Sequence, residues 1–176
     1  MLLDHHVTKL EEQLRAAGIP KKEAKRYKNA AGRILGKMTD EGLRRLKQNL
    51  IAYHFYPDLA ALRAEAGHET TLGFYRSSNK TLHLDGGEEG SDSIHYIYAH
   101  EFTHALDGPH DDMSGSKEWQ GAWQEEMVEG YTFGEAAADA PDEGLAQLGE
   151  WMLRGKRAEA RRFCPKCAAI WEGFAL

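Results

Sequence analysis

Three side chains whose types suit metal-assisted hydrolysis stand close together in the segment YIYAHEFTHALDG, residues 96–108. His100, Glu101 and His104 follow the spacing H-E-x-x-H. On a helix, residues four apart lie on one face, so both imidazoles can bind one zinc ion at about 2.0–2.1 Å. Glu101 is rotated by about 100° from His100, so it reaches a water molecule on that ion instead of the ion itself. The pattern predicts a zinc site in which Glu101 is the general base for a metal-activated water.

The flanking residues add weight to this short motif. With nine histidines in 176 residues, a chance H-E-x-x-H somewhere in the chain is roughly a few per cent likely. However, the same segment is apolar on most sides, which predicts a buried helix. Buried polar groups need partners, and a metal ion supplies one. The apolar flank consists of Ile94, Ile97, Tyr98, Ala99, Phe102, Ala105 and Leu106.

A third zinc ligand is expected downstream, because a catalytic zinc ion usually has three protein ligands. His110 would suit the metzincin pattern H-E-x-x-H-x-x-G-x-x-H, but Asp107 stands where that pattern has glycine. Glu135, in GEAAAD, resembles the Glu of a thermolysin-type Glu-x-x-x-Asp helix. Glu143 falls in the first turn of a stronger predicted helix, APDEGLAQLGEWML. The spacing alone leaves these candidates open.

The segment IYAHEFTHALD, a tryptophan-bearing helix and then APDEGLAQLGEWML together resemble the gluzincin domains. That group includes the anthrax lethal factor protease domain, the bacterial Pro-Pro endopeptidases and the Mlc titration factor A peptidases. The resemblance covers about Gly67 to Leu153, includes a hairpin like GFYRSSNKTLHL, and specifies the clan instead of one family. It implies that the chain is a zinc metalloendopeptidase and that Glu143 is the third zinc ligand.

Two further site residues are assigned. The resemblance implies a tyrosine that stabilises the oxyanion shortly before the ligand Glu. The nearest matching position holds Ala136, which has no hydroxyl, so Tyr131 is the available substitute. Asp107, three residues after His104, falls on the ligand face and is predicted to accept the second N–H of a ligand histidine.

The N-terminal part of the chain, residues 1–66, is predicted to be a helical scaffold. Apolar residues recur at helical spacing in three segments. Gly18 is typical of a helix end, whereas Pro20 and Thr39 or Asp40 are typical of helix starts. The predicted helices span about 4–18, 20–35 and 39–55.

The catalytic part, residues 67–153, is predicted to begin with a β-hairpin. Strand-prone residues at 70–75 and 81–84 flank a polar turn at 77–80. A cap at Asp92 or Ser93 then begins the helix that carries the H-E-x-x-H motif. Further helices are predicted over 116–130 and 140–163, and residues 154–176 form a C-terminal tail.

Two other groups are assigned structural roles. Trp119, Trp123 and Met127 lie on one face of the predicted helix over 116–130, so they are expected in the core. Cys164 and Cys167 form a C-x-x-C pair that lacks the second half of a zinc knuckle. They are therefore predicted to serve the structure instead of chemistry.

The whole chain, residues 1–176, is predicted to be a single α+β zincin-like domain, mostly helical, with a small hairpin or sheet beside the active-site helix. Its net charge of −6 argues against a nucleic-acid partner, because phosphate binding needs a basic face. The sequence shows neither a secretory signal nor an apolar run of roughly 18 residues, so a cytoplasmic protein without membrane contact is expected. The expected partner is a peptide or protein substrate.

Two other functional classes stay open. A non-catalytic zincin-like module, such as a regulatory or phage-associated binding protein, would keep the metal for stability or partner binding. Glu101 argues against it, because a structural site needs no base and is normally closed by four protein ligands. A metal-free helical adaptor would retain no zinc on gentle purification.

Overall fold

The structure is a computed structural model that describes residues 2–110, 112–130 and 133–176. Helices dominate it and one small sheet accompanies them, which confirms the predicted mostly helical α+β class. In chain order the elements are α1 (Leu2–Ala16), α2 (Lys21–Leu35), α3 (Asp40–Asn49), β1 (Ala52–Tyr56), α4 (Leu59–Ala66), β2 (Gly73–Arg76), β3 (Thr81–Asp85), α5 (Glu88–Asp107), α6 (Lys117–Trp123), the π-helical turn η1 (Gln124–Glu129), α7 (Glu135–Asp139), α8 (Pro141–Arg154), α9 (Arg157–Phe163) and α10 (Pro165–Ala175).

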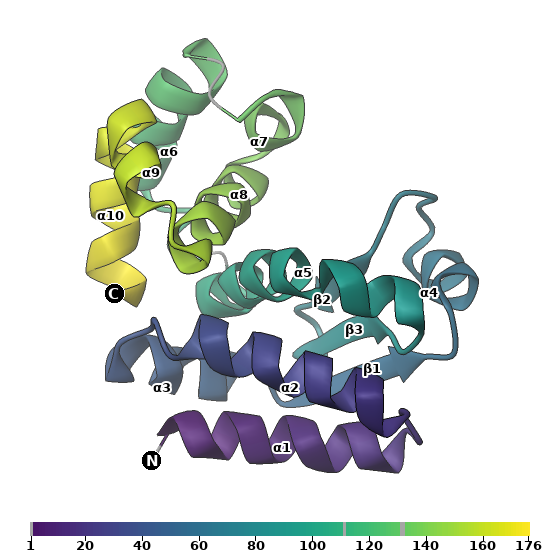
Figure 1. The fold of residues 1–176 in the computed structure, drawn as a ribbon. Helices are drawn as coiled ribbons and strands as arrows, with labels where there is room; N and C mark the ends of the chain where they lie inside the picture. Colours follow the sequence, from purple (N-terminus) through teal and green to yellow (C-terminus); the bar gives the residue numbers. More distant parts are fainter. Residues whose placement is uncertain (1, 111, 131–132) are drawn as a thin grey trace.

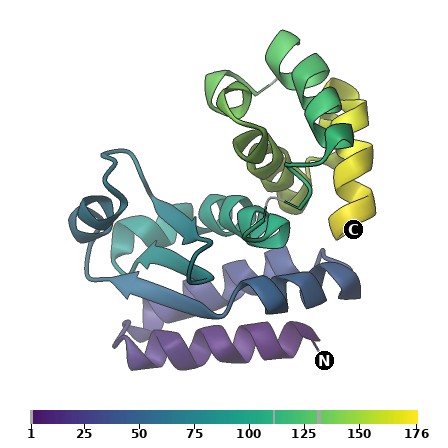
Figure 2. The ribbon, with the colours of Figure 1, turned by 180° about the vertical axis from the view of Figure 1, so that it is seen from behind.

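Helix α5 is the central element, and two groups of elements meet along it (Figure 1). Helix α2 packs on one side of α5 and separates it from α1, while α8 packs on the opposite side. The view from behind shows the sheet beside α5, with α6 to α10 gathered together away from the sheet and from α1 (Figure 2). The C-terminal helix α10 reaches back to the start of α3, where Thr39 N donates to Ala175 O at 3.2 Å. The motif-bearing helix therefore lies between the two halves of the molecule.

The sheet has three strands in the order β1-β3-β2. β2 and β3 form the predicted antiparallel hairpin, and β1 pairs with β3 in parallel. The prediction of a helix over 39–55 is wrong in its last third, because α3 ends at Asn49 and Leu50 is extended, with φ −123° and ψ 96°. The run AYHFY that follows is rich in aromatic residues, which suit a pleated surface better than a helix. This missed strand makes β3 the central strand and β2 an edge strand.

Helix α5 begins earlier than predicted. Its N-cap is Gly87, so the cap expected at Asp92 or Ser93 is wrong. The chain turns out of β3 through Asp85, whose Oδ1 accepts from Gly87 N at 2.8 Å. The helix ends at Gly108, which has φ +83° and passes so close to Asn49 that a Cβ there would lie 2.8 Å from its Nδ2. The C-terminal end of the site-bearing helix is thus set by a glycine with positive φ.

The predicted helix over 116–130 is present as α6 followed by η1. Its start is confirmed, because the Ser116 hydroxyl accepts from Trp119 N at 3.1 Å, as an N-cap does. Trp119 and Met127 are fully buried, which confirms their predicted place in the core, and Trp123 is half-buried.

The segment 140–163, predicted as one helix, is divided at Gly155. That glycine has φ +94° and caps α8, so α9 runs in a new direction. Residues 165–175 then form a further helix, α10, and its first N–H groups are satisfied by a distant side chain. The two Glu126 carboxylate oxygens accept from Lys166 N and Cys167 N, each at 3.0 Å.

Cys164 and Cys167 are both buried and free. Burial, together with the Glu126 carboxylate, raises the pKa of Cys164 to about 12 and that of Cys167 further still. A thiol with so high a pKa carries almost no thiolate at neutral pH, so neither cysteine has the character of a reactive group.

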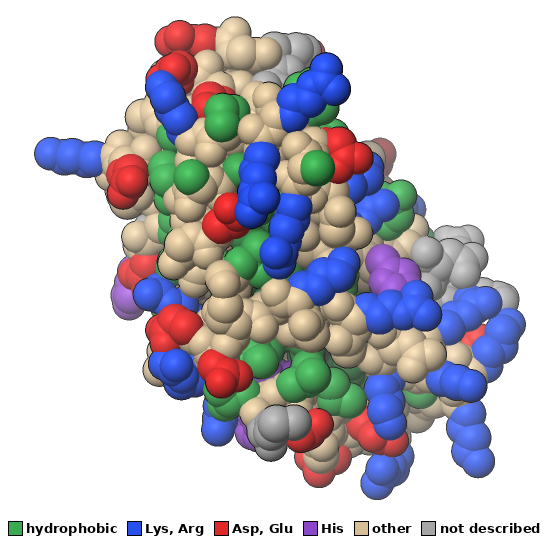
Figure 3. Space-filling model, turned by 60° about the vertical axis from the view of Figure 1, so that its left-hand side comes forward, with side chains coloured by type: hydrophobic (Ala, Val, Ile, Leu, Met, Phe, Trp, Pro, Cys, Tyr) green, Lys and Arg blue, Asp and Glu red, His purple; other side chains and the backbone are tan. Residues whose placement is uncertain are grey.

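Charge is distributed unevenly over the surface. Figure 3 shows Lys and Arg side chains gathered in a band across one face. Burial lowers the pKa of Lys37, and the positive charges of Arg157 and Arg154 lower it further. Burial likewise lowers the pKa of His95, with Arg33 and Arg154 adding to the effect. These basic side chains therefore lie near one another. The net charge of the whole chain does not describe this face, so the expected absence of a nucleic-acid partner stays a prediction.

Candidate metal centre

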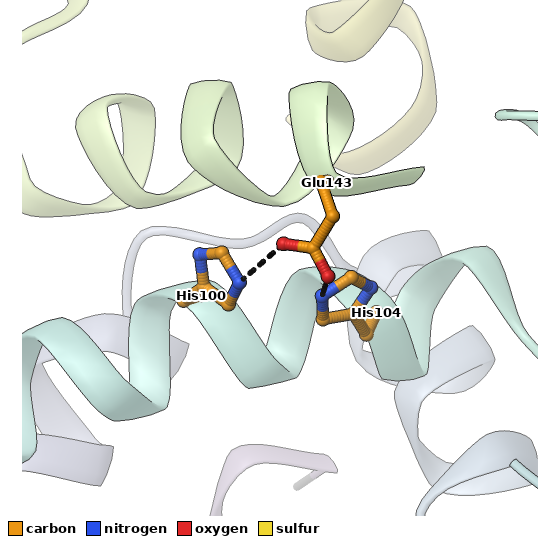
Figure 4. A group of neighbouring side chains, drawn as sticks. All are labelled: His100, His104 and Glu143. Atoms are coloured by element: carbon orange, nitrogen blue, oxygen red, sulfur yellow. Dashed lines mark ion pairs between the residues drawn. The ribbon is translucent and has the colours of Figure 1, made fainter. Parts of the chain in front are cut away.

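Two histidines from α5 and one glutamate from α8 converge. His100 Nε2 lies 3.4 Å from Glu143 Oε2, and His104 Nε2 lies 3.7 Å from Glu143 Oε1. Figure 4 shows both imidazoles directed from α5 toward the carboxylate that descends from α8. One ligand atom from each residue fits within a mutual distance of 4.8 Å. Across the described parts of the chain, no other set of three His, Cys, Asp or Glu side chains is grouped this way.

The start of α8 positions Glu143. Pro141 opens the helix, and Glu143 lies in its first turn, where a carboxylate is favoured by the unpaired N–H groups. Two indoles from α6 hold α7 and the start of α8 in place, since Trp119 Nε1 donates to Pro141 O and Trp123 Nε1 donates to Ala137 O of α7, each at 2.8 Å. The tryptophans predicted as core residues therefore also anchor the segment that carries the glutamate.

A close crossing of α5 and α8 brings the glutamate to the histidines. A Cβ built on Gly149 of α8 would lie 2.8 Å from Thr103 Cβ on α5, and closer still to its Oγ1. Thr103 has little freedom to move, because it is buried and its hydroxyl donates to Ala99 O at 2.9 Å. The missing side chain at position 149 thus permits the helix spacing that the site requires.

Gly149→Ala is expected to destabilise the protein by about 1–3 kcal/mol, because the added methyl group forces α8 away from α5. Urea unfolding measures the change. Gly32→Ala on α2 is the matched control, since its Cβ would meet nothing within 4 Å; removing a helical glycine there should stabilise by up to about 1 kcal/mol. Equal unfolding free energies for the two variants would contradict the proposed close crossing.

Glu101 lies beside the three converging residues and is held by backbone. Its side chain is almost fully buried, and Oε2 accepts from Tyr75 N of β2 at 2.8 Å. Burial raises the pKa of Glu101 to about 7, although His100 and the Tyr75 N–H oppose this rise. A carboxylate with a pKa near neutrality is suited to accept and return a proton.

The other pKa shifts suit a cation site. Burial, followed by repulsion from His100, lowers the pKa of His104 to about 4, so this imidazole is neutral at pH 7. Burial also lowers the pKa of His100, but the Glu143 hydrogen bond and the Glu101 charge outweigh it and raise the net value. The His100 hydrogen bond holds the pKa of Glu143 below its usual range. Two imidazole nitrogens and one ionised carboxylate form the donor set of a catalytic zinc site with an open position, so these residues fit zinc.

The three residues open onto a cleft of about 710 Å³, which lies within the size range of ligand sites. β2 and the loop before it form one wall, α5 forms the floor, and α7 with α8 forms the other wall. The lining residues include Phe74, Asp107, Asp139 and Asp142 besides the converging group, and no Lys or Arg is among those described.

The strand that borders this cleft is β2. The central strand β3 contributes none of the described residues that line the cleft. His83 belongs to the central strand β3, is buried, and its Nδ1 is 2.9 Å from Tyr56 Oη. The Tyr75 N–H, which reaches Glu101, was missed because a backbone contact leaves no signal in residue types.

The remaining predicted site residues are dispersed. Glu135 is exposed on α7 and is outside the converging group, as is His110, which is exposed after α5. Asp107 lines the cleft, and its carboxylate accepts from Met113 N at 2.7 Å, from Ser114 N at 3.0 Å and from the Ser114 hydroxyl. It therefore orders the loop after α5, and its bond to a ligand histidine stays a prediction. Tyr131 lies outside the described residues.

Comparison with known proteins adds no relative: no family model matches the sequence, and no curated protein matches it. Within the described residues, no helix is both long and apolar enough to cross a lipid bilayer. The function is therefore inferred from the geometry of this chain and from the chemistry of its residues.

Proposed function

We propose that this protein is a zinc-dependent metallopeptidase with a zincin-like fold of the gluzincin type. His100, His104 and Glu143 bind Zn²⁺, and Glu101 is the general base in peptide-bond hydrolysis. One observation carries the proposal: two helices that are separate in sequence bring three zinc-type donors together beside a buried carboxylate. A site that only stabilised the fold would have no use for that fourth group.

Bound zinc would supply a Lewis acid for the scissile carbonyl and for the attacking water. Glu101 takes the proton from that water and returns it to the leaving amine. Burial raises its pKa, which suits a group that must both accept a proton and release it. The Tyr75 N–H holds Oε2, so Oε1 is the atom that exchanges the proton.

An extended peptide suits the cleft as substrate. β2 is an edge strand on the cleft wall, and the outward direction of the Tyr75 N–H shows that this edge faces the site. The Tyr75 N–H itself is held by Glu101, and main-chain pairing with the other outward groups of this edge would hold a peptide without demanding one sequence. Tyr131 is the proposed oxyanion donor and, like the cytoplasmic location, it stays a prediction.

Zinc dependence tests the proposal directly. Chelator-treated protein is expected to show no cleavage of a random decapeptide mixture, and one equivalent of Zn²⁺ should restore it, with new termini identified by mass spectrometry. Mg²⁺ is the control ion, because it prefers oxygen ligands over imidazole. Cleavage that persists without metal, or its absence in fully zinc-loaded protein, would argue against a zinc peptidase.

A further inference from the structure

A second hollow lies beside the cleft, and Glu101 borders both. It has a volume of about 220 Å³ and is bounded by Leu72 before β2, by Tyr96 and Ile97 on α5, and by Glu150 on α8. Gly73, His100 and Glu101 line both this hollow and the cleft. The hollow, called here the side recess, therefore adjoins the cleft across these three residues.

The side recess presents apolar surface to solvent. Leu72 is 38% exposed and Tyr96 is 50% exposed, and they are two of the four large apolar side chains exposed in the described residues. The other two, Ile51 and Phe163, do not line it. Because exposed apolar area costs about 25 cal/mol per Å², its concentration beside a reactive group marks a binding surface.

The wall of the side recess is rigidly built. The guanidinium of Arg154 lies 3.4 Å from the centroid of the Tyr96 ring, and Arg154 Nη1 donates to Glu150 Oε1 at 2.6 Å. Gln147 Nε2 donates to Glu150 Oε2 at 3.1 Å. The Glu150 charge is thus matched inside the protein, so the recess does not offer an unpaired acid to a basic side chain. A ring held in place before binding loses little entropy when a ligand arrives.

The size of the recess limits its occupant. At about 220 Å³, the recess is smaller than a usual small-molecule site. One leucine, methionine or phenylalanine side chain has four to seven heavy atoms beyond Cα, whereas small-molecule sites usually begin at about 300 Å³. Gly73 packs directly on Ile97, because a Cβ there would lie 2.5 Å from Ile97 Cγ2, so a side chain at position 73 would intrude on the recess.

We infer that the side recess is the subsite for one apolar side chain of leucine, methionine or phenylalanine size, carried by a substrate residue next to the bond that is cleaved. The inference rests on the proposed function, since it places the scissile bond at Glu101. Leu72 and Tyr96 form the outer wall of this subsite and Ile97 its base. They set the substrate preference without taking part in the chemistry.

Binding to the zinc-loaded Glu101→Gln variant tests the subsite without cleavage. The probes are heptapeptides GAAXAAG with X as glycine, leucine, phenylalanine or lysine, titrated by calorimetry. The peptides with leucine or phenylalanine at X are expected to bind about tenfold or more tightly than the glycine peptide, and the lysine peptide no better than the glycine peptide. Adding Leu72→Ala and Tyr96→Ala should remove most of that preference, whereas Tyr96→Phe and the exposed control Ile51→Ala should retain it. Equal binding of all four peptides, or a preference for lysine, would overturn the inference.

Cleavage of the same peptides by the zinc-loaded wild type separates the two proposals. Faster turnover of the leucine and phenylalanine peptides, lost in the Leu72→Ala, Tyr96→Ala variant, supports both. Selective binding without any cleavage would support the subsite and contradict the proposal that the protein is a peptidase. Cleavage that is indifferent to X, with unselective binding, retains the peptidase and contradicts the subsite.

Discussion

Glu101→Gln is expected to lower kcat/KM for peptide cleavage by about 10²–10⁴-fold and to leave the zinc content unchanged. Glutamine has the size of glutamate, and its carbonyl oxygen can still accept the Tyr75 N–H that holds Oε2 in the wild type. It cannot take a proton from the attacking water. Because Glu101 lies outside the group of three zinc donors, the loss should concern catalysis instead of metal binding.

The measurement combines initial rates on a fluorogenic peptide with metal analysis of the same samples. Circular dichroism and thermal unfolding check that the variant is folded. Undiminished cleavage would show that Glu101 is not the base. A simultaneous loss of zinc would instead make Glu101 part of the metal-binding group, which the geometry does not indicate.

Glu143→Ala is expected to weaken zinc binding by about 100-fold or more, with a matching loss of activity at limiting zinc. Removing a hydrogen-bond partner of a zinc ligand already lowers metal affinity about 10–100-fold, so the loss of a ligand should lower it at least as much. The Glu143 side chain is 44% exposed, and its replacement should leave the fold intact. Competition with a zinc-binding dye measures the dissociation constant.

Glu135→Ala is the matched control for this ligand assignment. Glu135 is also an acid near the start of a short helix in the same region, but it is exposed and lies outside the converging group. Its replacement should leave zinc affinity unchanged. If Glu135→Ala weakened zinc binding and Glu143→Ala did not, the third ligand would be reassigned to Glu135, and the geometry of α8 would have no role in the site.

Local features of the site could be predicted from short stretches of sequence. The spacing of His100 and His104 places them on one helical face, because a helix turns once in 3.6 residues. The hairpin from 73 to 85, the cap at Ser116 and the proline at the start of α8 follow equally local rules. Each depends on contacts within a few residues, which neighbouring side chains determine on their own.

Other features depended on pairing between distant segments. The strand β1 was missed because its pairing with β3 outweighed the continuation of a helix. The spacing of residues alone left Glu135, Glu143 and His110 as competing ligands. Only the crossing of α5 and α8 at Gly149 brings Glu143, instead of the others, to the two histidines.

The H-E-x-x-H motif and its helix were thus determined by sequence alone, whereas the groups that surround the motif were decided by tertiary structure. The buried state of Glu101, its contact with the Tyr75 N–H and the side recess all arise where the edge of β2 meets α5. A helix carries its own hydrogen bonds, so its pattern is visible in the sequence. Burial and shape belong to surfaces formed by several elements, and no spacing within one segment contains them.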